Sequence, residues 1–178
     1  MQSARRLLME RGYHGVGLRE VAGDAGISRQ TVYRHFESKV DLLVALAQYG
    51  DELIGISELL RPVREARTAL EALDKGVAAY AAIEPLIYDV WYTTYSARRS
   101  DPVAEIVWQE RMSTRRESIK GDIERLHKEG VLADGWTVDE ATDFVWALLS
   151  VHTYEYLAVE RKWPVERFVQ RLRETLRC

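Results

Sequence analysis

The sequence predicts an all-α protein of nine helices. Apolar residues recur at helical spacing along most of the 178 residues, and no sustained period-two alternation bounded by hairpin turns indicates a strand. Serine or threonine precedes several of these apolar segments as a helix-starting signal, and TVDE at 137–140 forms a capping box. We expect three helices in an N-terminal head and six in a C-terminal body.

The head is expected to contain a first helix over residues 2–11, a second from about residue 18 and a third from about residue 29. The last two are hinged on Gly26, because glycine can adopt the positive φ that ends a helix. Ser28 is expected to cap the third helix. The contacts between the two helices are expected from Val21, Ala22, Ile27, Val32 and Phe36.

The body is expected to begin with a fourth helix that Ser38 caps and that continues to about residue 60, where Pro62 intervenes. Pro85 and Pro102 each suit the first turn of a later helix, and Gly130 ends another. The remaining helices are expected over residues 63–82, 85–98, 102–129, 138–161 and from Trp163-Pro164 to about 177.

Composition indicates a soluble globular protein, with 47% hydrophobic and 30% charged residues. No apolar segment approaches the roughly 20 residues that span a bilayer, and no signal-peptide core precedes a cleavage site. The single Cys178 cannot form an internal disulfide, which fits a reducing compartment. We therefore expect a cytoplasmic protein with no membrane partner, no cofactor and no metal.

The charge is unevenly distributed along the chain. Net charge is −3, yet residues 1–50 carry seven Lys/Arg against five Asp/Glu, whereas residues 51–178 carry 18 against 23. The basic excess is thus confined to the head, where it would attract phosphates.

The outer face of the third helix carries hydrogen-bond donors and almost no acid. Arginine and glutamine can bond base edges with two hydrogen bonds, while threonine, tyrosine and lysine position phosphates. This chemistry predicts DNA binding in a major groove, with an ordinary helical hairpin that has a polar face as the alternative. The residues concerned are Arg29, Gln30, Thr31, Tyr33, Arg34 and His35.

Residues 4–46 resemble the N-terminal domain of tetracycline-repressor-like (TetR/AcrR-like) transcriptional regulators. The resemblance is carried by Gly12-Tyr13, LREVA at 18–22, AGIS at 25–28, TVYRHF at 31–36 and SK-x-x-LL at 38–43. It implies a DNA-binding domain over 1–46 and a ligand-binding and dimerisation domain over 47–178. Because the family's first helix normally has further turns and often a basic arm, we also expect residues ahead of Met1.

The resemblance also implies roles for individual residues. Arg29, Gln30 and Arg34 are expected at base edges, and Arg19 at a base or a phosphate. Lys39 is expected to hold a phosphate at the start of the fourth helix. The chain departs from the family at Gly17, where a serine or threonine often stands and only the backbone amide remains here. The other expected contacts are the capping Ser28, and Thr31, Tyr33 and His35 at phosphate or sugar.

Two of these assignments have structural alternatives. His35 is also consistent with a solvated surface imidazole. Tyr33 is consistent with a ring that packs partly on the aliphatic stem of Lys39.

The body is rich in aromatic residues, which suit an apolar cavity with a few polar tips. The family likeness implies a small-molecule effector between the fifth and eighth helices, whose binding shifts the fourth helix. Each aromatic residue alone is better explained by core or interface packing than by ligand contact. The expected lining of this largely apolar site is Tyr88, Trp91, Tyr92, Tyr95, Trp108, Met112, Trp146 and His152.

The last helix carries an apolar stripe, which either packs within the body or forms a four-helix interface between two copies. The resemblance favours a homodimer that presents two DNA-binding heads to a palindromic operator. We therefore expect a transcriptional regulator, with repression favoured. The alternatives are an activator or nucleoid-type binder, a helical ligand-binding dimer without DNA binding, or an enzyme, for which no catalytic motif is present. The stripe comprises Val165, Phe168, Val169, Leu172 and Leu176.

Overall fold

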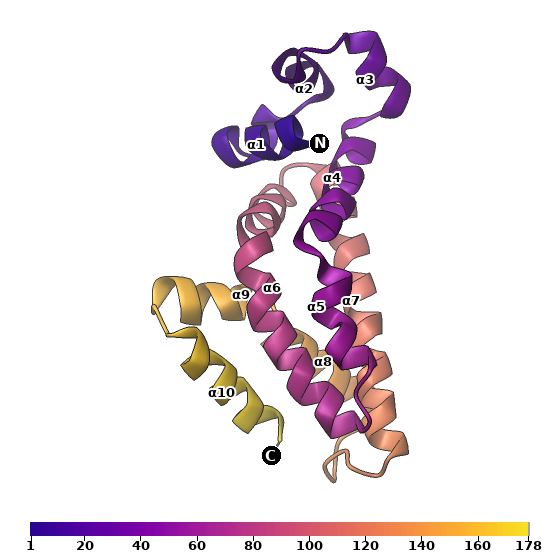
Figure 1. Cartoon of the computed structure of the whole chain (residues 1–178), viewed down its shortest axis with the longest axis vertical. Helices are drawn as coiled ribbons and strands as arrows, with labels where there is room; N and C mark the ends of the chain where they lie inside the picture. Colours follow the sequence, from indigo (N-terminus) through magenta and orange to yellow (C-terminus); the bar gives the residue numbers. More distant parts are fainter. Residues whose placement is uncertain (178) are drawn as a thin grey trace. The chain divides into compact units, whose positions relative to one another are not determined.

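The computed structural model describes residues 1–177, apart from the side chains of Tyr13, Leu53 and Asp89. Cys178, on which the expectation of a reducing compartment rests, lies outside the described residues. The described chain contains no strand, which confirms the all-α class (Figure 1).

Its helices are α1 Gln2–Arg11, the short 3₁₀ turn η1 Tyr13–Gly15, α2 Leu18–Ala25, α3 Arg29–His35, α4 Lys39–Ile54, α5 Ile56–Arg64, α6 Ala69–Ala97, α7 Pro102–Lys128, α8 Val138–Leu148, α9 Val151–Tyr154, the π-helical η2 Glu155–Glu160 and α10 Val165–Leu176.

The helices form two compact units. Unit 1 comprises Met1–Ile54 and Ile87–Arg111, and unit 2 comprises Gly55–Leu86 together with the chain from Met112 onward. Each unit has its own apolar core. Unit 1 therefore extends beyond the 46 residues that the sequence assigns to a separate domain, and the division of roles between 1–46 and 47–178 stays a prediction.

The turn between α2 and α3 forms as the sequence predicts. Gly26 has φ 64° and ψ 26°, and the amide of Ile27 donates to the carbonyl of Ala22 at 3.1 Å, which closes the end of α2. Val32 is only 2% exposed and packs into the core of unit 1. Ile27, in contrast, is 47% exposed and is not part of the buried core, so the contact expected from it is weaker than that of Val32.

The core of unit 1 joins this pair of helices to α1, α4 and the ends of α6 and α7. Leu7 and Leu42 are fully buried in it, beside Ala97 and Ala104. At the start of α4, the Asp41 amide donates to Ser38 Oγ at 3.2 Å and the Ser38 amide donates to Asp41 Oδ2 at 2.9 Å. This reciprocal pair confirms Ser38 as a cap and fixes where α4 begins.

The predicted fourth helix is wrong at its end. Gly55 adopts φ 70° and ψ 40°, so α4 ends at Ile54 and α5 begins at Ile56. A glycine can take this left-handed conformation without strain. Apolar residues keep helical spacing on both sides of Gly55, and the sequence pattern therefore gave no sign of the break.

The predicted helix boundary at Pro85 is also wrong. A single helix, α6, passes through Pro85 from Ala69 to Ala97. A proline inside a helix costs about 3 kcal/mol, because it removes a hydrogen bond and crowds the preceding turn. Ala81, Ile83 and Ile87 are buried around Pro85, and their burial offsets this cost. Pro62 likewise lies inside α5 and does not end it.

The core of unit 2 is built around α6, α7, α8 and α10. Phe168 is 1% exposed, and its ring centroid lies 5.9 Å from that of Tyr80 and 6.1 Å from that of Tyr154. Leu172 is buried in the same core. Val169 and Leu176 pack against the same core, so four of the five residues of the α10 stripe pack within the chain, as the intramolecular alternative requires. The capping box of Thr137 and Glu140 at the start of α8 is confirmed.

The predicted continuous helix over 138–161 is wrong. It is interrupted after Leu148, because Ser150 has an extended backbone with ψ 158° and its Oγ accepts a hydrogen bond from the Thr153 amide at 3.3 Å. The carbonyl of Leu149, which that amide would bond in a continuous helix, accepts instead from the guanidinium of Arg115. The Tyr80 hydroxyl donates to the Ser150 carbonyl at 2.7 Å. Side chains from α6 and α7 thus stabilise the break.

Beneath this break lies a buried carboxyl group. Glu84 is 1% exposed, and neither of its carboxylate oxygens has a hydrogen-bond partner among the described residues. Arg115 Nη1 lies 3.6 Å from Glu84 Oε2, an ion pair too long for a good hydrogen bond. Burial raises the pKa of Glu84, and the charge of Arg115 opposes this only in part.

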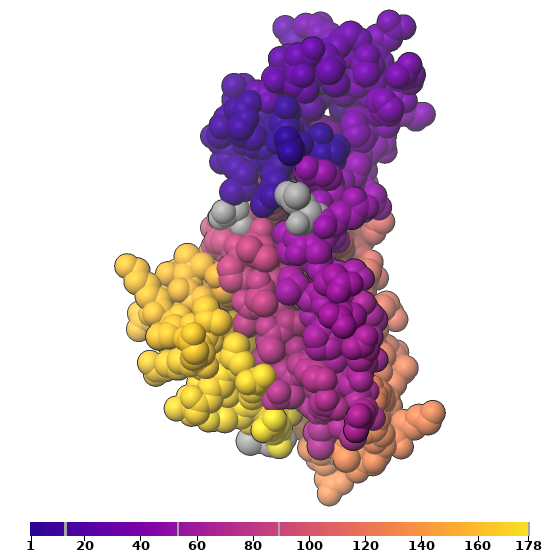
Figure 2. Space-filling view, in the orientation of Figure 1, coloured from indigo at the N-terminus to yellow at the C-terminus, as the bar shows by residue number. Residues whose placement is uncertain are grey.

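No described helix combines the length and the apolar character that a bilayer crossing needs. Figure 2 shows η2 and α10, in yellow, as a continuous part of the visible surface of unit 2. On these elements Tyr156, Val159 and Val165 expose large apolar side chains.

The raised pKa of Glu84 predicts a pH-dependent stability. The folded protein keeps this carboxyl proton to a higher pH than the unfolded chain, whose pKa is near 4.5, so the free energy of unfolding falls as pH rises above that value. Each unit of pKa elevation corresponds to about 1.4 kcal/mol. Glu84→Gln should therefore gain stability relative to the wild type as pH rises from 4.5 through neutrality, measured by denaturant unfolding at several pH values.

Glu71→Gln is the matched control, since a hydrogen bond from Lys75 lowers the pKa of Glu71 and the trend should have the opposite sign. Parallel pH curves for wild type and Glu84→Gln would contradict the interpretation.

Candidate nucleic-acid interface

The outer face of α3 is exposed over nearly its whole length. Of its seven residues only Val32 is buried, which leaves the donors on the opposite side open to a ligand. The predicted contact residues Arg29, Gln30 and Arg34 are all exposed. In the described chain no acidic residue lies within α3, so the face it presents is cationic.

The start of α3 is fixed by hydroxyl groups. The Thr31 amide donates to Ser28 Oγ at 3.0 Å, and Ser28 Oγ lies 2.8 Å from Thr31 Oγ1. Ser28 therefore caps α3, as the sequence predicts. Ser28 and Thr31, both predicted to contact DNA, are hydrogen-bonded to each other through their hydroxyl groups, which fixes these groups at the first turn of α3.

The start of α2 is where the chain departs from the family pattern. A Cβ atom at Gly17 would lie 2.6 Å from Glu20 Oε2, so the glycine leaves room for the carboxylate of Glu20 to fold back over the helix start. An acidic group is favourable there because the helix N-terminus carries partial positive charge. Arg19, on the same turn, is exposed.

Lys39 begins α4 and is partly buried. Burial lowers the pKa of its ammonium group, while the charges of Asp101 and Glu20 act in the opposite direction. A phosphate at the start of α4 would restore the environment that favours the charged ammonium. Arg19, Arg29 and Lys39 thus belong to the first turns of three successive helices in one compact unit.

Two predicted contacts had structural alternatives. Tyr33 is 53% exposed, so most of its ring is open to solvent. His35 is exposed, and its ring centroid lies 6.4 Å from that of Phe36. Their assignment to phosphate or sugar stays a prediction.

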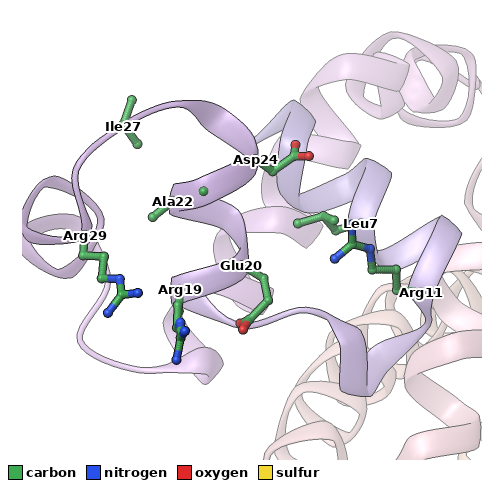
Figure 3. A pocket seen from close by; sticks show the side chains of 9 residues that line it. Leu7, Arg11, Arg19, Glu20, Ala22, Asp24, Ile27 and Arg29 are labelled. Atoms are coloured by element: carbon green, nitrogen blue, oxygen red, sulfur yellow. The ribbon is translucent and has the colours of Figure 1, made fainter.

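A cleft lined by Arg19 and Arg29 opens on the surface of unit 1, with a volume of about 480 Å³. Figure 3 shows Arg19 and Arg29 along one side and Arg11 on the other, with Glu20 between them. Arg11 was not among the residues predicted to contact DNA. The only signal in the sequence was a basic residue in the last turn of α1, directly before Gly12. The cleft is lined by Leu7, Arg11, Arg19, Glu20, Ala22, Gly23, Asp24, Ile27 and Arg29.

Five residues predicted to line an effector site lie in unit 1, where they pair with one another and with arginines. Tyr88 and Tyr92 stack with ring centroids 5.5 Å apart, and Tyr95 meets Trp108 at 5.1 Å. Trp91 is buried, with the guanidinium of Arg111 5.0 Å from its ring centroid, and Arg98 lies over Tyr95. These contacts fit the core alternative that the sequence left open, and the assignment of the five residues to an effector site stays a prediction.

The other three predicted lining residues, Met112, Trp146 and His152, belong to unit 2. Trp146 Nε1 is buried and lacks a hydrogen-bond partner among the described residues, and His152 Nδ1 lies 3.7 Å from Glu155 Oε2. Because the predicted set divides between two units, its assembly into a single cavity stays a prediction.

Unit 2 also has an apolar cavity of about 100 Å³. Trp136 and Phe144, with ring centroids 5.2 Å apart, lie at this cavity together with Leu70 and Leu176. None of the predicted lining residues borders it.

Comparisons with known proteins find similarity to DNA-binding regulators in this N-terminal segment. Residues 1–46 match the family model described as bacterial regulatory proteins, tetR family. A curated relative, the HTH-type transcriptional activator FasR of Mycolicibacterium smegmatis, is 38% identical over 72 residues, which cover 39% of this chain. The chain spans only about a third of the length of that relative, 33%.

Solved structures extend the similarity to the whole fold. A structure described as a TetR-family transcriptional regulator from Rhodococcus sp. has a TM-score of 0.78 at 15% identity, covering 98% of this chain and 93% of that one. The transcriptional regulator FadR of Bacillus subtilis in complex with stearoyl-CoA has a TM-score of 0.76 at 20% identity, covering 98% and 94%. The chain is therefore TetR-like: its first 46 residues match the tetR family model, and its described helices adopt the all-α fold of these regulators.

Proposed function

We propose that this protein is a DNA-binding transcriptional regulator that recognises a palindromic operator as a homodimer. The observation that carries the proposal is the exposed cationic face of α3 within a segment that matches the tetR family model. A two-turn helix with Arg29, Gln30 and Arg34 outward has the donors that base edges in a major groove accept. The first turns of α2 and α4 add Arg19 and Lys39 for phosphates.

The proposal includes release from DNA by a small, largely apolar effector. The aromatic residues on α6 and α7 support an apolar ligand, and FadR, which shares the fold, is found in complex with stearoyl-CoA. Such an effector regulates only if it binds better to the conformation that does not fit the operator. Repression by occupying the operator is the favoured sign of regulation.

Activation is a second candidate, because the curated relative FasR is a transcriptional activator. A reporter gene placed behind a selected operator would distinguish the two signs: expression falls on addition of a repressor and rises on addition of an activator.

Dimerisation is supported by the apolar surface of η2 and α10. Tyr156 is 57% exposed, and Val159 and Val165 are each more than 40% exposed. These side chains remain outward although Phe168 and Leu172 face the core of unit 2. A surface of this kind is self-complementary in a two-fold dimer, in which the same patch faces itself.

The first prediction separates base contacts from phosphate contacts. Arg29→Ala and Gln30→Ala should each weaken binding to the operator by about 1–3 kcal/mol and relax base preference, because a two-bond contact to a base edge is lost. Lys39→Ala should weaken binding to all sequences to a similar degree and reduce its salt dependence. Mobility-shift titrations at several salt concentrations measure both effects, on an operator selected from a randomised duplex pool.

A scrambled duplex of the same length is the control. Equal losses on operator and scrambled DNA for all three variants would remove the assignment of base contacts to α3.

The second prediction concerns assembly. Val159→Glu, which introduces a charge into the exposed apolar surface of η2, should shift the protein from dimer to monomer in sedimentation equilibrium. Glu160→Gln, at the neighbouring exposed position, is the matched control and should remain dimeric. A wild-type protein that sediments as a monomer at micromolar concentration would contradict the proposed dimer.

A further inference from the structure

The cleft on unit 1 holds three arginines, and no carboxylate among the described residues is hydrogen-bonded to any of them. Arg11, Arg19 and Arg29 all line it, from the end of α1, the start of α2 and the start of α3 (Figure 3). Among the side chains that the structure describes, none forms an ion pair or a hydrogen bond with these three guanidinium groups, and Arg11 acts on the carboxylate of Asp24 only at longer range. Other arginines of this protein are paired with carboxylates: Arg6 with Asp24, Arg61 with Glu58 and Arg115 with Glu84.

Arg11 is held at the cleft by its contact with the backbone of the following turn. A Cβ atom at Gly15 would lie 2.4 Å from the Cβ of Arg11 and 3.6 Å from its Cγ and Cδ. Gly15 does not have a positive φ, so a glycine is needed here because a larger side chain would clash with Arg11, and not because of the backbone conformation. The stem of Arg11 therefore passes directly over Gly15, and any larger residue would displace it.

The two acidic residues of the cleft are engaged elsewhere. Asp24 accepts a hydrogen bond from Arg6, a residue outside the cleft lining, and this contact lowers the pKa of Asp24. The carboxylate of Glu20 folds over Gly17 at the start of α2. The cleft thus combines three arginines with one carboxylate held at a helix N-terminus and one already paired, which leaves an excess of positive charge facing solvent.

We propose that this cleft binds a phosphate of the DNA backbone beyond the bases that α3 contacts, and that Arg11 is the residue that extends the contact. The inference rests on the proposed function. Guanidinium groups bind phosphate through two parallel hydrogen bonds, and arginines from three elements can follow a strand as it leaves the groove. Arg11 is a positioning contact that carries no base preference.

The same chemistry would accept a free phosphate group, such as that of a nucleotide. The open cleft and its continuity with Arg29 on the outer face of α3 favour the DNA backbone, because a strand that lies along α3 passes Arg29 and Arg19 before it reaches Arg11.

The test measures how operator affinity depends on salt concentration. Each phosphate contact contributes about 0.9 to the slope of log affinity against log salt, so Arg11→Ala should reduce the slope by about 0.9 for each protomer bound. Its affinity at moderate salt should fall roughly threefold to tenfold, equally on operator and scrambled duplexes. Arg11→Lys, which keeps the charge, should retain most of the slope.

Two further variants separate position from charge. Gly15→Ala leaves all charges in place but puts a Cβ atom 2.4 Å from that of Arg11, so the turn and the end of α1 must separate. Because Arg11 moves with the end of α1, this variant should lose salt dependence as Arg11→Ala does. Arg161→Ala removes one exposed charge from unit 2 and should leave the slope unchanged. Thermal melting monitors folding of every variant, and if Gly15→Ala does not fold, the comparison of Arg11→Ala with Arg11→Lys decides.

The outcomes distinguish this inference from the proposed function. An unchanged slope for Arg11→Ala, in a protein whose wild type binds duplex DNA, overturns the phosphate contact and leaves the DNA-binding function intact. A wild type that binds no duplex overturns both. Calorimetric titration with inorganic phosphate, without DNA, should give no Arg11-dependent binding at micromolar concentrations, and tight binding there would assign the cleft to a free phosphate ligand and overturn the DNA contact.

Discussion

The packing of α3 against α2 is the constraint on which the N-terminal surface depends. A helix of seven residues is too short to be stable alone, so tertiary contact must hold it. Val32 supplies the only buried side chain of α3, and the left-handed Gly26 sets the angle at which the helix leaves α2. Once these two residues are in place, every other side chain of α3 is directed outward or along the helix start. The exposed cationic face is thus a consequence of one small apolar contact.

A different kind of constraint operates in unit 2. Glu84 and Arg115 are a poorly bonded pair in a buried site, where the cost of desolvation exceeds the attraction across 3.6 Å. Arg115 also donates to the carbonyl of Leu149, and Tyr80 donates to that of Ser150. The interruption between α8 and α9 is therefore tied to the charge state of a buried group. The π-helical turn η2 that follows belongs to a class of irregularity found at functional sites in many helices.

The two predicted sites differ in how far apart their residues lie along the chain. The proposed DNA contacts fall within residues 17–39, so correct helix starts were enough to bring them to one surface. The proposed effector-lining residues extend from Tyr88 to His152, and their relative positions depend on how α6, α7 and α8 pack. The structure divides them between two units. Arg11 was missed for a related reason: its approach to Arg19 and Arg29 depends on how α1 meets α2, which no local pattern records.

The sequence by itself determined the helix starts that have local causes. Ser28, Ser38 and Thr137 each accept a hydrogen bond from the amide three residues ahead, and Gly26 needs only its own backbone freedom, so these features are independent of the rest of the fold. Tertiary structure alone decided where helices continue or stop. Buried neighbours carry α6 through Pro85, whereas Arg115 and Tyr80 help to interrupt the apolar pattern at Leu149. Several buried side chains and long-range hydrogen bonds together outweigh local propensity there, because their summed free energy exceeds the cost of about 3 kcal/mol that a proline imposes within a helix.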